Sequence, residues 1–277
     1  MITYPNVKVN LGLNVLEKRP DGYHNLETLF VPCSGLHDTL EIITGEDYSR
    51  TLGSLREHYS QLAQAISPDG KLMISIARKE GVHWDPLSDL TARAYFLLAR
   101  DHQLPPMKIY LEKGSPVGAG LGGGSADAAF ALRMIARLAG LDLADATLAN
   151  YAAALGSDCA FFIYNRPMFG SGRGEVLEDY PLSLEGLKLE VIVPEGIAVS
   201  TADAYRGIVP ALPQKPLKEV LRQNPSTWRE DLRNDFETTV FQKYPMLKEL
   251  KEKLYREGAL YASMSGSGSA FFTLRRV

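Results

Sequence analysis

Residues 115–125 read Ser-Pro-Val-Gly-Ala-Gly-Leu-Gly-Gly-Gly-Ser, with five glycines between positions 118 and 124. The preceding residues 107–112 alternate as in a β-strand, and residues 126–139 are mostly apolar, enough for about four helical turns. Gly140 is placed to end that helix, and Ser125 to cap its start. Glycine lets a ligand approach bare backbone N–H groups, and a helix N-terminus favours an anion. The stretch therefore predicts a phosphate-binding loop between a strand and a buried helix.

The surrounding sequence argues against several nucleotide-binding patterns. Residues 118–123 fit G-x-G-x-x-G, but residues 140–145 open a second helix where a dinucleotide-binding fold needs a strand ending in an acid. The loop lacks the lysine of a P-loop, and the chain has neither His-Arg-Asp nor Asp-Phe-Gly of protein kinases. The alternative is that the glycine-rich stretch forms a tight turn that binds no ligand. We consider it less favourable, because a plain turn rarely needs five glycines.

Composition restricts the class of protein. The chain has 277 residues, 45% hydrophobic and 23% charged, as expected of one large or two smaller globular domains. A net charge of −3 gives no reason to expect nucleic acid or an anionic membrane as a partner, so any anion site must be local. Cys33 and Cys159 do not suggest a disulfide framework. We find neither a signal peptide nor a membrane span, and expect a cytoplasmic protein.

The N-terminal strand has one apolar and one polar face. Alternation over residues 7–15 places four residues on the polar face, Lys8, Asn10, Gly12 and Asn14. That face is either solvated or a lined pocket, and two asparagines and a glycine, which are poor strand formers, favour the pocket. A turn at residues 18–22 then predicts a hairpin with a strand at 23–31. Tyr23 and His24 leave this turn together, either to pack or to bind an aromatic ligand.

Asp158 is the second unusual charge. It follows a helix predicted at residues 145–155 and precedes the apolar run 160–163, which we interpret as a strand. An acid beside apolar sequence is costly to bury without a partner, although a surface turn is the simpler reading. We further expect a helix from Ser88 or Asp89 to about residue 102, a short helix capped by Ser200 or Thr201, a helix at about 226–241 and a small-residue loop at 265–269. Residues 45–70 suggest no function.

Three motifs together resemble the GHMP kinases, the group of galactokinase, homoserine, mevalonate and phosphomevalonate kinases. Residues 6–13 with 19–24 are similar to the N-terminal signature of one member of the group, a kinase that acts on a cytidine diphosphate conjugate. Residues 116–129 are similar to the glycine-rich phosphate loop of the whole group, and residues 265–269 to its C-terminal glycine motif. The resemblance covers essentially the whole chain. It implies an α+β, two-lobed GHMP kinase fold with the active site in the cleft between lobes. It also implies an N-terminal ATP-binding domain at 1–155 and a C-terminal substrate-binding domain at 156–277.

The resemblance also implies roles for individual residues. Asp158 would be the general base, and Lys8 its electrostatic partner at the acceptor hydroxyl. The implied ATP-binding residues are Pro116, Val117, Gly118, Ala119, Gly120, Leu121, Gly122, Gly123, Gly124, Ser125 and Asp89. The implied substrate-binding residues are Asn10, Tyr23, His24, Thr201, Tyr205, Gly266 and Ser267. Ser88-Asp89-Leu90 stands where the group usually has Asp-Asn-Leu near the adenine.

The implied activity is ATP-dependent phosphorylation of a cytidine diphosphate conjugate, the 2-hydroxyl of 4-diphosphocytidyl-2-C-methyl-D-erythritol, in isoprenoid precursor synthesis. ATP and Mg²⁺ are the expected cofactors. The metal ligands are left open, with Ser125 the best single candidate. We expect a monomer or weak homodimer with no nucleic-acid or membrane partner. One alternative is a kinase of the homoserine or mevalonate type, but those substrates contain no base on which Tyr23 and His24 could stack. Another alternative is a non-catalytic nucleotide-binding module, which would not need Lys8 and Asp158.

Overall fold

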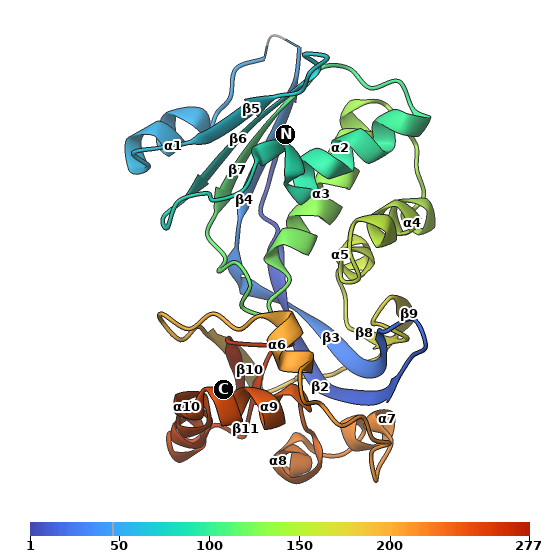
Figure 1. Ribbon diagram of the computed structural model, residues 1–277, viewed down its shortest axis with the longest axis vertical. Helices are drawn as coiled ribbons and strands as arrows, with labels where there is room; N and C mark the ends of the chain where they lie inside the picture. Colours follow the sequence, from blue (N-terminus) through green and yellow to red (C-terminus); the bar gives the residue numbers. More distant parts are fainter. Residues whose placement is uncertain (46) are drawn as a thin grey trace. The chain divides into compact units, whose positions relative to one another are not determined.

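The computed structural model describes residues 1–45 and 47–277; Glu46, within the segment to which no function was assigned, lies outside the described residues. The contacts between residues of the chain divide it into two units (Figure 1). The first unit comprises Met1–Val7, Leu36–Ser115 and Gly123–Asn165. The second comprises Lys8–Gly35, Pro116–Gly122 and Arg166–Val277. This differs from the predicted single boundary after residue 155, because strands near the N-terminus pair with strands that come after residue 165.

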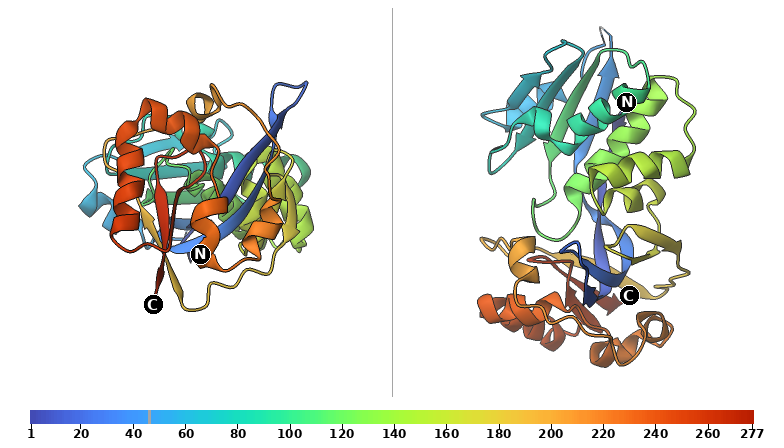
Figure 2. Two further views of the ribbon diagram at one scale, coloured as in Figure 1. Left: turned by 90° about the horizontal axis from the view of Figure 1, so that it is seen from below. Right: turned by 45° about the vertical axis from the view of Figure 1, so that its right-hand side comes forward.

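The first unit is a sheet with helices on both faces. Its five strands are ordered β1 (Ile2–Thr3), β4 (Thr39–Thr44), β7 (Met107–Lys113), β6 (Leu72–Arg78) and β5 (Ala63–Ile66). Among these described strands, β6 and β7 run parallel, and each of the other neighbouring pairs is antiparallel. Helices α2 (Leu90–Asp101), α3 (Gly123–Leu138), α4 (Asp145–Leu155) and α5 (Cys159–Tyr164) lie together on one side, as the right-hand view of Figure 2 also shows. Helix α1 (Leu52–His58) packs through Leu55 on the other face.

The second unit contains two antiparallel sheets. One is ordered β2 (Asn6–Lys18), β3 (His24–His37), β8 (Met168–Ser171) and β9 (Val176–Asp179). The other is ordered β10 (Leu187–Ile192), β12 (Phe271–Arg276) and β11 (Tyr261–Met264). Its helices are α6 (Thr201–Tyr205), α7 (Leu217–Leu221), α8 (Trp228–Asp231), α9 (Phe236–Lys243) and α10 (Pro245–Arg256). Short 3₁₀ turns occur at Pro86–Ser88 and Pro225–Thr227.

Most predicted elements are confirmed, and three are wrong in an informative way. Residues 160–163 belong to helix α5 and not to a strand, because a short run that is buried on every side carries no periodicity. The helix expected at 226–241 is broken at residues 232–235. There the chain runs extended and pairs with β2, with Leu13 N–H donating to Arg233 O at 2.8 Å and Asp235 N–H to Leu13 O at 2.9 Å. Ser125 lies inside the first turn of α3 instead of capping it, since the helix begins at Gly123.

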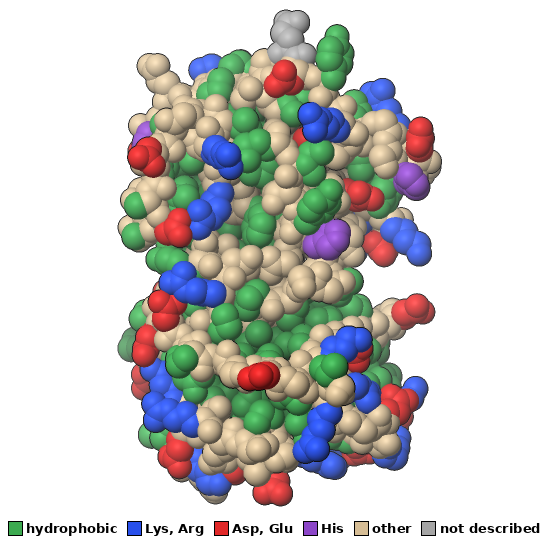
Figure 3. Space-filling model, turned by 180° about the vertical axis from the view of Figure 1, so that it is seen from behind, with side chains coloured by type: hydrophobic (Ala, Val, Ile, Leu, Met, Phe, Trp, Pro, Cys, Tyr) green, Lys and Arg blue, Asp and Glu red, His purple; other side chains and the backbone are tan. Residues whose placement is uncertain are grey.

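Two general properties agree with the composition. On the face shown in Figure 3, Lys and Arg side chains are interspersed with Asp and Glu, in keeping with the small net charge. Within the described residues, none of the helices combines the length and the apolarity that crossing a bilayer requires.

Candidate active site

The first part of the glycine loop is held in the second unit. Gly120 O accepts hydrogen bonds from Lys8 Nζ at 3.1 Å and from Ser265 Oγ at 3.0 Å. Ala270 N–H donates to Ala119 O at 3.1 Å, so the loop lies against the 265–269 loop. Gly120 has φ +79°, and a Cβ there would stand 2.1 Å from Ser265 O. The structure therefore joins the two predicted glycine motifs and explains why Gly120 must lack a side chain.

Lys8 and Asn10 belong to a buried polar chain. Lys8 is 3% exposed and Asn10 2%, and Lys8 Nζ donates to Asn10 Oδ1 at 2.6 Å. Asn10 Nδ2 donates in turn to Thr28 Oγ1 at 3.0 Å, and Thr28 Oγ1 to Gly12 O at 2.6 Å. The polar face of β2 is thus buried, which excludes the solvated-face alternative. Thr28 was not predicted from the sequence, because a threonine within a strand is ordinary.

The second part of the glycine loop begins helix α3 in the first unit. Gly123 is buried, and a Cβ there would lie 2.3 Å from Ser115 Oγ. Gly124 is exposed, and the nearest atom to an added Cβ would be Leu90 Cδ1 at 3.8 Å. The Ser125 hydroxyl hydrogen-bonds the Cys159 thiol, whose pKa burial raises to about 12. Protein packing therefore explains the glycine at position 123 but not the one at position 124, where the need for a glycine would come from a ligand.

Two predicted acids occupy different local settings in the first unit. Asp89 caps α2, accepting from Thr91 N–H at 2.9 Å and Thr91 Oγ1 at 2.7 Å, while Trp84 Nε1 donates to its other oxygen at 3.1 Å. This gives Asp89 a structural role independent of any nucleotide. Asp158 immediately precedes α5, is half-buried and makes no capping hydrogen bond to the helix. Lys8 and Asp158 belong to different units.

Four of the predicted substrate-binding residues in the second unit lie in two pairs. The His24 and Tyr205 rings stack at a centroid separation of 4.9 Å, and Tyr205 meets Phe236 edge-on at 4.7 Å. Burial, together with the nearby Lys18 charge, lowers the pKa of His24 below its usual value. Thr201 Oγ1 and Ser267 Oγ lie 3.1 Å apart. The structure therefore brings together residues that the sequence separates by 181 and 66 positions.

Tyr23 and Gly266 have separate neighbours. Tyr23 is 56% exposed, and the Arg173 guanidinium lies 4.8 Å from its ring centroid. A Cβ on Gly266 would approach Gly120 O at 3.1 Å and Asn10 Oδ1 at 3.3 Å, so Gly266 packs beside the buried polar chain. Arg173 was missed by sequence reasoning, and its position in the glycine-rich turn 169–174 was the one available signal.

Comparison with known proteins identifies the family of this chain. The model of the GHMP kinase N-terminal domain matches residues 89–166, and that of the C-terminal domain matches residues 216–275. A 4-diphosphocytidyl-2-C-methyl-D-erythritol kinase of Bacteroides fragilis is 46% identical over 274 residues, covering 99% of this chain and 92% of that protein. This chain belongs to the GHMP kinases.

Other GHMP kinases show how far the likeness extends. The kinase of the same name from Bacteroides thetaiotaomicron is 43% identical, with 99% of this chain and 92% of that protein covered. A crystal structure of 4-(cytidine 5'-diphospho)-2C-methyl-D-erythritol kinase superposes with a TM-score of 0.76 at 31% identity, covering 99% of this chain and 90% of that one. The homoserine kinase from Cytophaga hutchinsonii, at 17% identity and a TM-score of 0.61, shares the fold.

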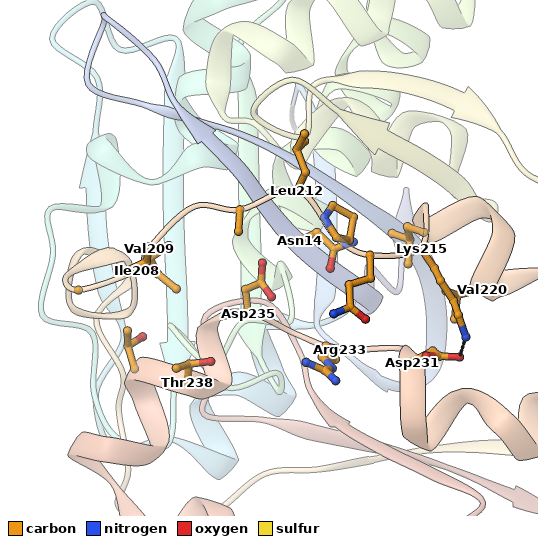
Figure 4. A pocket seen from close by; sticks show the side chains of 16 residues that line it. Asn14, Ile208, Val209, Leu212, Lys215, Val220, Asp231, Arg233, Asp235 and Thr238 are labelled. Carbon is orange, nitrogen blue, oxygen red and sulfur yellow. Dashed lines mark hydrogen bonds and ion pairs between the residues drawn. The ribbon is translucent and has the colours of Figure 1, made fainter.

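This GHMP kinase also has a cavity of about 320 Å³ in the second unit (Figure 4). Segment 207–217 forms one wall, and Asn14, Asp235 and Thr238 line the other side. Lys215 and Asp231 form an ion pair of 2.6 Å at its edge, and Asp235 Oδ2 accepts from Val15 N–H at 2.7 Å. None of the predicted catalytic or binding residues is among the described residues that line it.

Proposed function

We propose that this GHMP kinase transfers the γ-phosphoryl group of ATP to the 2-hydroxyl of 4-diphosphocytidyl-2-C-methyl-D-erythritol, a step of non-mevalonate isoprenoid precursor synthesis. The observation that carries the proposal is the 46% identity to a kinase of that name across 92% of its length. The exposed Tyr23 ring and the His24–Tyr205 ring pair support it, since a cytosine base binds well on aromatic planes. Homoserine and mevalonate contain no base that such rings could hold.

Phosphoryl transfer depends on positioning and charge stabilisation more than on covalent chemistry. In our proposal the backbone N–H groups of residues 118–125 bind the ATP phosphates, with Pro116 and Val117 shaping the entry to the loop. Asp158 accepts the proton of the substrate hydroxyl, and the Lys8 ammonium stabilises negative charge on the transferred group. The hydrogen bonds from Lys8 to Asn10 and Gly120 would hold that ammonium in one position.

The remaining predicted residues are assigned to the substrate and to the metal. Tyr23, His24 and Tyr205 would bind the cytidine, and Asn10, Thr201, Gly266 and Ser267 the rest of the conjugate. Mg²⁺ bound through ATP phosphates needs only one or two protein oxygens, and the Ser125 hydroxyl in the first turn of α3 fits that chemistry. When bound, Mg²⁺ neutralises phosphate charge. Asp89 remains a candidate for the adenine side in addition to its role as a helix cap.

A direct assay tests the proposal. The purified protein is incubated with Mg-ATP and, separately, with 4-diphosphocytidyl-2-C-methyl-D-erythritol, homoserine, mevalonate and galactose, while ADP release is followed. We expect turnover with the cytidyl substrate alone. Turnover with homoserine or mevalonate but not the cytidyl compound would reject the substrate assignment. ATP binding without turnover on any of the four would favour the non-catalytic alternative.

A further inference from the structure

Three charged side chains are buried together in the first unit, at the point where the chain enters and leaves the glycine loop. Lys113, at the end of β7, forms ion pairs with Asp38 and with Asp127, the latter at 2.5 Å. All three residues are at most 7% exposed. Asp127 lies one helical turn beyond Gly123, the first residue of α3. The network therefore connects three segments that are distant in sequence.

Asp38 also holds the residue from which the loop departs. Its Oδ1 accepts from Ser115 N–H at 2.6 Å, and its Oδ2 accepts from Ser115 Oγ at 2.9 Å. The loop returns at Gly123, whose Cα packs so closely on Ser115 that a Cβ would stand 2.3 Å from Ser115 Oγ. Departure and return are thus fixed against each other by one carboxylate and one serine.

The network contains more negative than positive groups. Two carboxylates face one ammonium, and within the part of the chain that the structure describes Asp127 Oδ1 has no hydrogen-bond partner. Burial raises the pKa of Asp127 well above its usual value, against the opposing effect of Lys113. Burial alone would lower the pKa of Lys113, but Asp127 and then Asp38 outweigh it and raise that pKa. A buried network of this kind is weak evidence for stability, because apolar packing in its place is often equally stable or more stable.

We infer that Asp38, Lys113 and Asp127 are positioning residues that hold the two ends of the glycine loop together and so preorganise it for the ATP phosphates. The inference rests on the proposed function, in which that loop binds ATP. A loop whose ends are fixed in the free protein has less conformational entropy to lose on binding. Loosening the ends should therefore weaken ATP binding, while leaving the affinity for the cytidyl substrate unchanged.

Ser115→Ala is the mildest test, because it removes one hydrogen bond to Asp38 and no charge. We expect a folded protein in which the dissociation constant for Mg-ATP, measured by calorimetry, rises at least threefold. KM for the cytidyl substrate should change less than twofold. Asp38→Asn replaces one accepting oxygen by an NH2 group, which meets either Lys113 or the Ser115 N–H, and should raise the same constant more than tenfold. If Asp38→Asn does not fold, Ser115→Ala decides alone.

A stability control separates positioning from general weakening. Ile74→Ala removes a fully buried side chain from β6 outside the network and should lower Tm at least as much as Ser115→Ala, with less than a twofold effect on Mg-ATP binding. Equal losses of ATP affinity in the two variants would overturn the inference. Because calorimetry needs no turnover, a protein that fails the acceptor assay still tests the network.

A rescue experiment examines the contact between the loop ends. Gly123→Ala alone should bind Mg-ATP poorly, because its Cβ collides with the Ser115 side chain. In Ser115→Gly/Gly123→Ala the nearest remaining atom is Asp38 Oδ2 at 3.6 Å, an ordinary contact. The double variant should therefore bind Mg-ATP more tightly than Gly123→Ala. Affinity losses that simply multiply would show that the two ends are not coupled.

Discussion

At the scale of single residues, two buried lysines have different hydrogen-bonding partners. Lys113 is paired with two carboxylates, whereas Lys8 donates to an amide oxygen and a backbone carbonyl. Alternation along the strand predicted the face on which Lys8 lies. It could not predict the burial of Lys8, because Gly120, which accepts its hydrogen bond, is 112 residues away.

The proposed role of Asp158 can be tested by removing its charge alone. Asp158→Asn keeps the shape of the side chain but cannot accept the hydroxyl proton, so kcat should fall about 10²–10⁴-fold. Binding of Mg-ATP should stay within about twofold of the parent. Both are measured on the same preparation, by ADP release and by calorimetry. A kcat within tenfold of the parent would exclude Asp158 as the general base.

The lowered pKa of His24 predicts a pH dependence of stability. An unfolded histidine titrates near 6.5, whereas burial keeps folded His24 neutral to lower pH. As pH falls below about 6.5 the unfolded chain binds the proton first, so this contribution to stability is complete above that pH and is lost below it. His24→Gln should therefore show a smaller decrease in Tm between pH 7.5 and 5.5 than the parent. A Tm curve parallel to that of the parent would contradict this.

At the scale of the element, the glycines of one loop serve different purposes. Gly120 and Gly123 make room for neighbouring protein atoms, whereas a Cβ on Gly124 would meet no crowding. The sequence predicted the loop, the strand before it and the helix after it from local pattern. It could not separate glycines needed for packing from those open to a ligand, because Ser115 and Ser265 become neighbours only in the fold.

Gly124→Ala should change stability and ATP binding in opposite directions. Alanine favours a helix over glycine by up to about 1 kcal/mol, so Tm should rise slightly. The new methyl group would obstruct a phosphate at the exposed start of α3, and KM for ATP should rise about tenfold or more. Thermal unfolding and initial rates test both parts. An unchanged KM for ATP would mean that this turn does not contact the phosphates.

The elements that we predicted incorrectly are those whose apolar residues follow no clear helical or strand period. Helix α5 was mistaken for a strand because all its residues from Cys159 to Ile163 are buried. The break between α8 and α9 depends on Asn234, whose Nδ2 donates to Met264 O at 2.7 Å and Gly266 O at 2.8 Å. Both features come from tertiary contacts, which override local propensity.

At the scale of the whole molecule, neither unit is a continuous piece of chain. Residues 8–35 belong to the second unit, where Leu13 and Val15 share a hydrophobic core with Phe236 and Phe271. A sequence read in order suggests one boundary, because composition does not reveal the pairing of β3 with β8, whose partners lie 138 to 142 positions apart. The family, by contrast, followed from motifs that are each local.

This division predicts the behaviour of fragments. Residues 1–155 would keep β2 and β3 without β8 and would lose α5, and residues 156–277 would lose Leu13 and Val15 from their core. We expect neither fragment to show a cooperative thermal transition by circular dichroism, while the full chain does. A cooperative transition in the isolated fragment 156–277 would show that residues 8–35 are dispensable for that core.

The pairing of β3 with β8 also affects how the protein is made. β8 begins at Met168, about 130 residues after β3 ends at His37. At typical translation rates of about 5–20 residues per second, the hairpin of β2 and β3 leaves the ribosome on the order of ten seconds before its neighbouring strand exists. During that time the edge of β3 is open to other nascent chains. Chaperone binding should therefore concentrate on the nascent chain between the emergence of β3 and that of β8.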